Sequence, residues 1–597
     1  MKRHHPLWHI SLSLLMLLIM HTSLFAQPQV PVTWGQARWL NSGCSLESYH
    51  SFIMMGDTLL AGGTLSDGSQ NPNYTPVVAH SFDNGQTWSA WQRLDSNFYD
   101  NVRLILSGAD GRIFAFYDTE DSTFHVTSQT MRSLDGGATW ATCLPPISNR
   151  WLSAGTAVGR QVVVVNIDTQ GHFDKRISIS DDGGDHWRLL IPLAGDSTFV
   201  IGAGLTRTNI LLDEARHVGR SSRVGVSVGD RSSQSWSPYQ DLPGQPMAAY
   251  IINSLLTADS SSETAIQLSV CTHTDGFVME TLYYQRTTDA GVSWSLPRTL
   301  SQGATLSSYM AEPEAFCHGK LWGVAWQDYG SADSTRWGIY FRLSANHGKD
   351  WYPQQYVDGV AFYSWYGTGQ FVGNEVRLYW QGFHDSWTTE DYRTVNGTLT
   401  PDTLPPALTL DLWGQDTIRQ GDTLRLEATA ADNDTLSEVR VLISDSGQVS
   451  TVSMERTSGS RYSTTFVVPH EGRFDYRGQA EDFWENITSV PDTGWLSFVA
   501  QGPSATSSFI LPPSSFAVSV FPNPSNGWPS LQLAPEWFAQ GPVTVSVYNL
   551  LGQRLLQRRL ANSRTSLAPD APSASGLFVL EVASGSRTAR QKLLILK

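Results

Sequence analysis

Aromatic, arginine and carboxylate side chains occur near the starts of several apolar segments in this chain of 597 residues. Aromatic rings stack on the faces of sugars, and charged groups hydrogen-bond sugar hydroxyls or acids. Such residues would bind a glycan if the fold brought them to one wet cleft. The alternative is that about half of them pack into the core, because alternation with period two does not show which face a strand turns inward. The candidates are Tyr49, His50, Asn101, Arg103, Arg150, Trp151, Tyr250, Tyr309, Glu312, Glu314, Tyr363, Trp365 and Tyr366.

The elements that must position these residues are marked by a repeated turn, whose clearest copy is S-L-D-G-G-A-T-W at 133–140. The aspartate can accept hydrogen bonds from backbone N–H groups about two residues further on, and glycine supplies the positive φ that such a turn needs. The tryptophan, as the first residue of the next strand, turns inward. Its burial stabilises the hairpin by roughly 2 kcal/mol or more.

The same turn recurs along the chain. Residues 81–88 match it fully, residues 180–187 match with His186 in place of threonine, and residues 227–236, 288–294 and 344–351 are degenerate copies. Their Asp or Asn positions are 83, 135, 182, 230, 289 and 346, with gaps of 52, 47, 48, 59 and 57 residues. A period near 50 with about four short strands per unit is typical of β-propeller blades.

A seventh group of strands, roughly residues 361–397, has no such turn. The early segment 32–40 reads as an isolated strand that would complete this group and close the ring, leaving no exposed sheet edge. We therefore predict a propeller of seven blades over residues 27–400. Six blades are the alternative, if the last group belongs partly to the first blade.

The repeated turn resembles the Asp-box, or BNR repeat, of sialidases and many other propellers. In that family the box lies on the blade periphery, away from the chemistry, so the resemblance implies a structural role for its residues. These are Asp83, Trp88, Asp135, Trp140, Asp182, Trp187, Asp289 and Trp294.

The resemblance also implies what a sialidase would need: three arginines around a carboxylate, a tyrosine nucleophile activated by a glutamate, and an aspartate acid/base. Tyr309 with Glu312 or Glu314 could supply the Tyr/Glu pair, and Arg103 one arginine. However, the family's early F/Y-R-I-P motif is absent, and its nearest equivalents are A-R-W-L at 37–40 and N-V-R-L at 101–104. As a binding protein, the propeller would instead use Tyr49, Trp151, Tyr250, Trp365 and Tyr366.

The composition points to an exported protein. Residues 1–26 combine Lys2 and Arg3, an apolar stretch over 10–20 and S-L-F-A at 23–26, as a signal peptide does. No other stretch is long and apolar enough to cross a bilayer. Asp and Glu total 55 against 40 Lys and Arg, a net charge of −15 without a basic run, so nucleic acid is not an expected partner.

Cysteines and acidic residues give no clear cofactor site. Cys44, Cys143, Cys271 and Cys317 lack metal-ligand spacing, and sequence does not choose between disulfides and free thiols. No cofactor is expected. The acidic turn Asp432-Asn433-Asp434 could hold a structural Ca²⁺, with an ordinary solvated loop as the alternative.

Two further β domains are expected after the propeller. Residues 401–500 show about seven short alternating strands, and F-D-Y-R-G-Q-A-E-D at 474–482 with Asn486 resembles the Y-x-x-x-A-x-D-x-x-x-N pattern of extracellular Ig-like β-sandwiches. After a linker at 501–515, residues 516–597 contain F-P-N-P at 521–524, Y-N-L-L-G-Q at 548–553 and a basic-ended C-terminus. This tail resembles the C-terminal sorting domain of the type IX secretion system of Bacteroidetes. The resemblance implies a small β-sandwich, recognition by that secretion machinery, and release from, or anchoring at, the surface of a Gram-negative cell.

The sequence thus predicts an all-β, secreted or cell-surface protein that binds glycans or other extracellular polymers. An exo-glycosidase acting at the central funnel and a structural or adhesive surface protein are the alternatives. The enzyme needs at least two arginines and a paired acid converging in the funnel. The binder needs only exposed aromatic residues there, and the adhesin neither.

Overall fold

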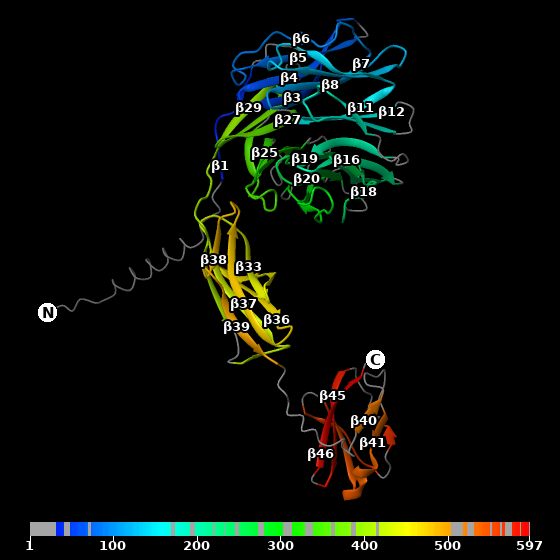
Figure 1. Ribbon diagram of the computed structural model, residues 1–597, viewed down its shortest axis with the longest axis vertical. Coiled ribbons are helices and arrows are strands. Elements are labelled where there is room, and N and C mark those ends of the chain that lie inside the picture. Colours follow the sequence, from blue (N-terminus) through cyan, green and yellow to red (C-terminus); the bar gives the residue numbers. More distant parts are fainter. Residues whose placement is uncertain are drawn as a thin grey trace, which may run out of the picture. The chain divides into compact units, whose positions relative to one another are not determined.

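The computed structural model shows an all-β chain whose largest part is a propeller (Figure 1). The residues that it describes are 31–40, 48–69, 73–168, 174–190, 198–218, 221–232, 235–244, 250–272, 280–301, 313–328, 338–359, 364–383, 390–413, 417–502, 518–521, 530–549, 552–560, 564–566, 576–585 and 587–595.

The first six blades are antiparallel sheets of four strands that follow one another in chain order. Blade one is β3 (Ser48–Met55), β4 (Thr58–Ser66), β5 (Tyr74–Ser81) and β6 (Gln92–Arg93), and blade two is β7 (Asn101–Ala109), β8 (Arg112–Glu120), β9 (Val126–Ser133) and β10 (Ala141–Ser148). Blade three is β11 (Arg150–Val158), β12 (Gln161–Asp168), β13 (Lys175–Ser180) and β14 (Arg188–Leu190), and blade four is β15 (Phe199–Leu205), β16 (Asn209–Val218), β17 (Ser221–Asp230) and β18 (Gln240–Asp241). Blade five is β19 (Tyr250–Ala258), β20 (Ala265–Thr272), β21 (Glu280–Thr287) and β22 (Arg298–Thr299), and blade six is β23 (Glu314–His318), β24 (Leu321–Asp328), β25 (Gly338–Ser344) and β26 (Gln355–Gly359).

Blade seven closes the ring with strands from both ends of the propeller segment. It contains β27 (Ser364–Val372), β28 (Glu375–Phe383) and β29 (Glu390–Leu399), and β29 pairs antiparallel with the early strands β1 (Val32–Trp34) and β2 (Arg38–Trp39). The first strands of successive blades contact one another around the ring, and β27 contacts β3. The prediction of seven blades is confirmed, and the six-blade alternative is wrong.

The blades are held together by apolar second strands that are buried on both faces. In β12, residues 162–165 are all valine and at most 1% exposed, and each buried valine contributes about 1.5–3 kcal/mol to folding. Successive blades approach closely: a Cβ on Gly155 of blade three would lie 2.4 Å from the ring of Phe116 in blade two. Only glycine fits at this contact.

The repeated turn connects the third and fourth strands of a blade. The hydroxyl of Ser133 donates to Asp135 at 2.7 Å and accepts the N–H of Gly137 at 2.8 Å. Asp135 accepts the backbone N–H and the hydroxyl of Thr139 at 2.8 and 2.6 Å. The donor thus lies four residues after the aspartate rather than two, because two successive glycines with φ of 73° and 97° turn the chain back toward the carboxylate. These hydrogen bonds lower the pKa of Asp135 to about 2. Trp140 precedes β10 and donates its indole N–H to the Gly137 carbonyl at 3.0 Å.

The chain after the propeller forms two further sheets, in which buried and exposed residues alternate as in an Ig-like sandwich. One sheet has the order β30 (Ala407–Trp413), β32 (Thr423–Ala431), β36 (Arg461–Val467), β35 (Glu455–Ser458). The other has the order β31 (Ile418–Arg419), β39 (Leu496–Gln501), β37 (Gly472–Asp482), β33 (Leu436–Asp445), β34 (Gln448–Ser453), with β38 (Ile487–Val490) paired to β37.

The C-terminal part is a separate small β structure around its own core. One sheet has the order β40 (Val518–Phe521), β41 (Ser530–Leu533), β44 (Arg564–Ser566), and the other β43 (Arg554–Leu560), β42 (Val543–Asn549), β45 (Gly576–Ser584), β46 (Arg587–Ile595). A short 3₁₀ helix, η1 (Pro535–Gln540), adds Trp537 to a core that includes Leu531, Val545, Leu580 and Leu593. The predicted all-β class with two β domains after the propeller is confirmed.

The turn between β37 and β38 is packed into the propeller. The propeller and residues 425–466 and 475–497 belong to one compact unit. Trp484 is 5% exposed and shares an apolar cluster with Val32, Phe341 and Trp380 of blades six and seven. Its carbonyl accepts a hydrogen bond from the ammonium of Lys320.

The sixth repeated turn departs from the common pattern where it meets these residues. Asn346 replaces the aspartate and still accepts the N–H of residue 350 at 2.9 Å, while its amide donates to the Asp350 carboxylate at 3.0 Å. Asp350 also accepts the hydroxyl of Ser437 at 2.5 Å, and Tyr352 contacts the carboxylate of Asp434. An aspartate at position 346 would repel Asp350, so the degenerate turn is fitted to this interface.

The thiols of the described residues are free and are buried or half-buried. Cys143, Cys271 and Cys317 are unpaired in the described part of the chain, and Cys44 lies outside it. Burial raises the pKa of Cys143 to about 11 and that of Cys271 to about 12, so these thiols are poor nucleophiles. None of the described residues forms a helix long and apolar enough to span a membrane.

Candidate functional site

Among the described residues, five of the seven first strands of the blades share an irregularity near their starts. In β3, β11, β15, β19 and β27, the pairing with the second strand shifts by one residue. A bulge re-aims the side chains beside it. The shifts fall at Tyr49/Ser51, Leu152/Ala154, Val200/Gly202, Ile251/Asn253 and Trp365/Gly367.

The aromatic residues predicted to bind a ligand lie on these bulged strands. Trp151 is half-buried on β11. The backbones of the other four lie on β3, β19 and β27, but their side chains are outside the described residues: Tyr49, Tyr250, Trp365 and Tyr366. Their role in binding remains a prediction.

The predicted catalytic residues are only partly described. Tyr309 and Glu312 lie outside the described residues, whereas Glu314 is the half-buried first residue of β23 in blade six. Arg103 lies on β7 in blade two, where its guanidinium donates to the Leu152 carbonyl of blade three at 3.1 Å. Arg103 therefore links two neighbouring blades, and a role toward a substrate remains a prediction.

A buried carboxylate lies beside this link. Asp118 is 1% exposed and accepts the N–H of Leu152 at 2.9 Å. Burial raises the pKa of Asp118 to about 6, although the Leu152 N–H and the charge of Arg103 oppose the rise.

A second cluster of buried ionisable residues contains members from blades three, four and five. The ammonium of Lys175 contacts the carboxylate of Glu214 and donates to the hydroxyl of Thr198 at 2.7 Å. Asp213 accepts the Ser254 hydroxyl at 2.6 Å, while its Oδ1 has no partner among the described residues. Burial raises the pKa of Asp213 to about 7, the hydrogen bond from Ser254 opposes the rise, and the charge of Glu214 adds to it.

The raised pKa values of Asp118 and Asp213 each contribute a loss of propeller stability as the pH rises from 4 to 7. The folded state holds the protons of Asp118 and Asp213 more tightly than the unfolded chain does. This stabilisation is complete below the unfolded pKa of 3.8 and is lost as the pH passes through about 6 and about 7. We expect the thermal midpoint of Asp213→Asn to decline less than that of the wild type over this range. Asp100→Asn removes an exposed carboxylate and should keep the wild-type slope; an unchanged slope in Asp213→Asn would contradict the assignment.

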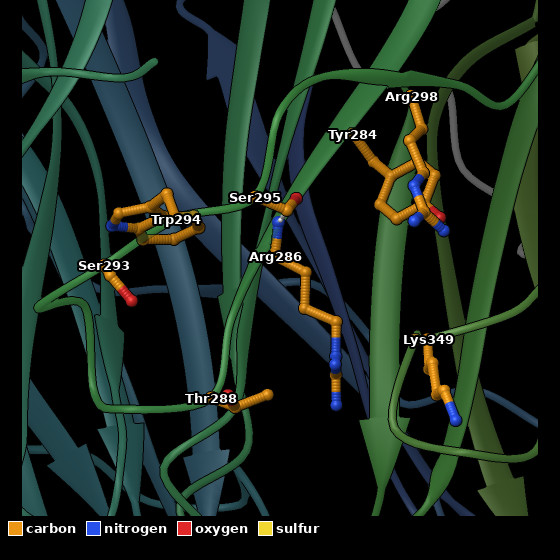
Figure 2. A pocket seen from close by; sticks show the side chains of 9 residues that line it. Tyr284, Arg286, Thr288, Ser293, Trp294, Ser295, Arg298 and Lys349 are labelled. Carbon is orange, nitrogen blue, oxygen red and sulfur yellow. Dashed lines mark hydrogen bonds between the residues drawn. The ribbon is translucent and has the colours of Figure 1, made fainter. Parts of the chain in front are cut away.

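An open pocket of about 320 Å³ lies where blades five and six meet (Figure 2). It is built from β21, β22 and the repeated turns of these two blades, and its volume is in the range of small-ligand sites. The lining residues are Tyr284, Arg286, Thr288, Ser293, Trp294, Ser295, Arg298, Gly348 and Lys349.

Two aromatic residues contribute to the pocket lining. Tyr284 is buried and packs edge-on against Trp351, with the ring centroids 5.7 Å apart. Trp294 is half-buried, and its indole N–H donates to the Gly291 carbonyl at 3.2 Å. Figure 2 shows Arg298 against Tyr284. Burial raises the pKa of Tyr284, and the charge of Arg298 opposes the rise.

Two further cations line the pocket and extend in the same direction in Figure 2. Arg286 is half-buried and donates its Nε–H to the His347 carbonyl at 2.6 Å. Burial lowers the pKa of Arg286. Lys349 forms ion pairs with Glu438 at 3.2 Å and Glu481 at 3.7 Å, both on the sandwich.

A cluster of three aspartates lies at the junction of linker and sandwich. Side-chain oxygens of Asp402, Asp432 and Asp482 lie within 4.8 Å of one another, a chemistry that suits Ca²⁺. The structure thus groups Asp432 with residues outside the predicted acidic turn, while Asp434 bonds Tyr352 instead. Burial is the main cause that raises the pKa of Asp432, and the nearby carboxylates add to it. Hydrogen bonds from the N–H groups of residues 484 and 486 already satisfy Asp482.

Sequence reasoning missed the pocket and the buried carboxylates. The available signal for Asp118 and Asp213 was an acid ending an apolar run, F-A-F-Y-D at 114–118 and I-L-L-D at 210–213. For the pocket, the available signal was that two successive repeats of an acidic chain carry basic residues near their turns: Arg286 and Arg298 in the fifth repeat and Lys349 in the sixth.

The fold and these sites define the class of the protein: an all-β chain with a seven-bladed propeller, a β-sandwich and a small C-terminal β domain. Residues 519–596 match the family model of the secretion system C-terminal sorting domain. This tail directs export through the type IX secretion system, to the cell surface or the medium, as the sequence predicted. No curated protein matches the chain.

Several solved structures resemble the chain at low identity. A protein of unknown function from Dyadobacter fermentans is 12% identical with a TM-score of 0.36, over 62% of this chain and 100% of that one. The Hadza microbial sialidase Hz136 is 15% identical with a TM-score of 0.33, over 47% and 63% of the two chains. Trypanosoma rangeli sialidase in complex with sialic acid is 10% identical with a TM-score of 0.33, over 95% and 87%.

Proposed function

We propose that this exported protein binds extracellular polysaccharides through its propeller. The observation that carries the proposal is the pocket between blades five and six, which combines aromatic walls, hydroxyl groups and arginines. Aromatic faces stack on sugar rings, while hydroxyls and guanidinium groups hydrogen-bond sugar hydroxyls. Export places the pocket where such polymers are found.

The pocket supports binding rather than hydrolysis. None of the described residues that line it carries a carboxylate, whereas glycoside hydrolysis commonly uses two. The funnel hypothesis of an exo-glycosidase rests on Tyr309, Glu312, Glu314 and Arg103. It is tested separately by the turnover of aryl glycosides, including an aryl sialoside, with the full chain and with Arg103→Ala.

Filling the pocket provides a direct test of binding. Thr288 is exposed at the second position of the fifth repeated turn, where other turns carry exposed Phe82 and Leu134. Thr288→Phe should therefore fold normally while occupying the pocket. We expect a panel of polysaccharides and glycans to include ligands of the wild-type full chain whose binding falls at least tenfold in Thr288→Phe.

The matched control is Leu134→Phe, which places the same ring at the same turn position of blade two. It should bind like the wild type. If Thr288→Phe bound saccharides as tightly as the wild type, the binding site would lie outside this pocket. Failure of the wild type to bind any saccharide would overturn the proposed function and favour the structural or adhesive alternative.

A further inference from the structure

We infer that the pocket between blades five and six takes an acidic saccharide, whose carboxylate or sulfate groups are held by Arg286, Arg298 and Lys349. This inference rests on the proposed function, because it specifies the chemical class of polysaccharide that the pocket selects.

The charge of the pocket is opposite to that of the protein. The chain carries a net charge of −15, yet three of the nine lining residues in the described part of the chain are cationic and none of these nine is acidic. Lys349 is paired with Glu438 and Glu481, so the positive charge that concentrates anions at the site comes mainly from Arg286 and Arg298. Guanidinium groups also offer paired N–H donors that match the two oxygens of a carboxylate or sulfate.

Arg286 is held in place and would form the fixed part of this anion-binding site. Its Nε–H is bound to the His347 carbonyl, and its two terminal nitrogens have no hydrogen-bond partner among the described residues. A half-buried guanidinium has lost part of its hydration, so an anion that meets its free edge gains more than at the open surface. Arg298 is exposed beside Tyr284 and can reach the same anion from solvent.

Lys349 can turn to a ligand without leaving buried carboxylates unpaired. Its partners Glu438 and Glu481 are also bound by Arg440, at 2.9 and 2.8 Å. When an anion enters the pocket, Arg440 still hydrogen-bonds both glutamates. The third cation of the pocket is therefore available to a ligand.

Three polymers with one backbone test the inference on the full chain: dextran, carboxymethyl-dextran and dextran sulfate. We expect at least tenfold tighter binding of one or both anionic dextrans than of dextran, and a further loss of affinity from 50 to 500 mM NaCl. Arg298→Gln should weaken this binding about tenfold. Arg286→Gln, checked for an unchanged thermal midpoint, should weaken it at least as much.

The control is Arg207→Gln, which removes the same charge from an exposed arginine elsewhere on the propeller. It should bind like the wild type. Equal, salt-independent binding of all three dextrans would contradict the inference that the pocket binds an anionic group. It would still support the proposal that the protein binds polysaccharides. Binding of polyglutamate as tightly as carboxymethyl-dextran would overturn the assignment to a saccharide. Absence of binding to these and all other saccharides would overturn the proposed function itself.

Discussion

Replacing Trp484 by alanine is expected to destabilise the full chain by about 3–5 kcal/mol and to undock the sandwich from the propeller. The indole fills an apolar cluster between blades six and seven that includes Val32, Phe341 and Trp380. Its removal leaves a cavity in a site that cannot collapse, because the surrounding strands belong to two closed blades. Val32 is part of the strand that closes the ring, so the loss of Trp484 also weakens that closure.

Urea unfolding followed by tryptophan fluorescence measures the loss, and small-angle scattering measures the undocking. Trp495→Ala is the matched control, because Trp495 lies on the same sandwich but is 38% exposed. It should cost less than about 1 kcal/mol, as surface substitutions do. If Trp484→Ala unfolded like this control, the packed junction would not exist in solution.

The repeated turn explains why the fold could be predicted from sequence. The clear copies encode a local structure, as in residues 133–139, where the Ser, Asp, Gly and Thr residues hydrogen-bond within a few positions of one another. The spacing of the copies then fixes the number of strands between them. The same local logic identified the early strand as the closing partner of the last blade, because a group of three strands leaves an unpaired edge.

The junction and the pocket could not be predicted in this way. Trp484 meets Phe341 and Val32 across more than a hundred residues of sequence, and no periodicity connects these positions. Arg286 lies on β21 and Lys349 lies in the turn of the next repeat, and neither position taken alone indicates a binding site. Only the close packing of blades five and six makes them neighbours. Tyr309 and Glu312 lie outside the described residues, so their catalytic assignment stays a prediction.

Near the pocket, one buried arginine of blade six connects blades five and six. We call the contact between these two blades the seam. Arg342 is 8% exposed, and its guanidinium donates to the carbonyls of Leu300, Tyr352 and Trp351 at 2.8, 2.7 and 3.2 Å. Trp351 in turn packs against Tyr284, a wall of the pocket. Arg342 therefore connects the stability of the seam to the shape of the proposed binding site.

Arg342→Met should keep the aliphatic volume but lose all three donors, leaving three buried carbonyls unpaired. Because each such loss costs about 1–3 kcal/mol, we expect a destabilisation of roughly 3 kcal/mol or more, together with weaker binding of any ligand that requires Thr288 and Arg298. Arg342→Lys keeps the charge but cannot span three divergent carbonyls, so it should recover only part of the loss. Arg425→Met, at a residue with a 59% exposed side chain, controls for the change in charge and should leave both readouts unchanged. A loss below about 1 kcal/mol in Arg342→Met would mean that water or other donors reach these carbonyls, and that the seam is looser than its packing indicates.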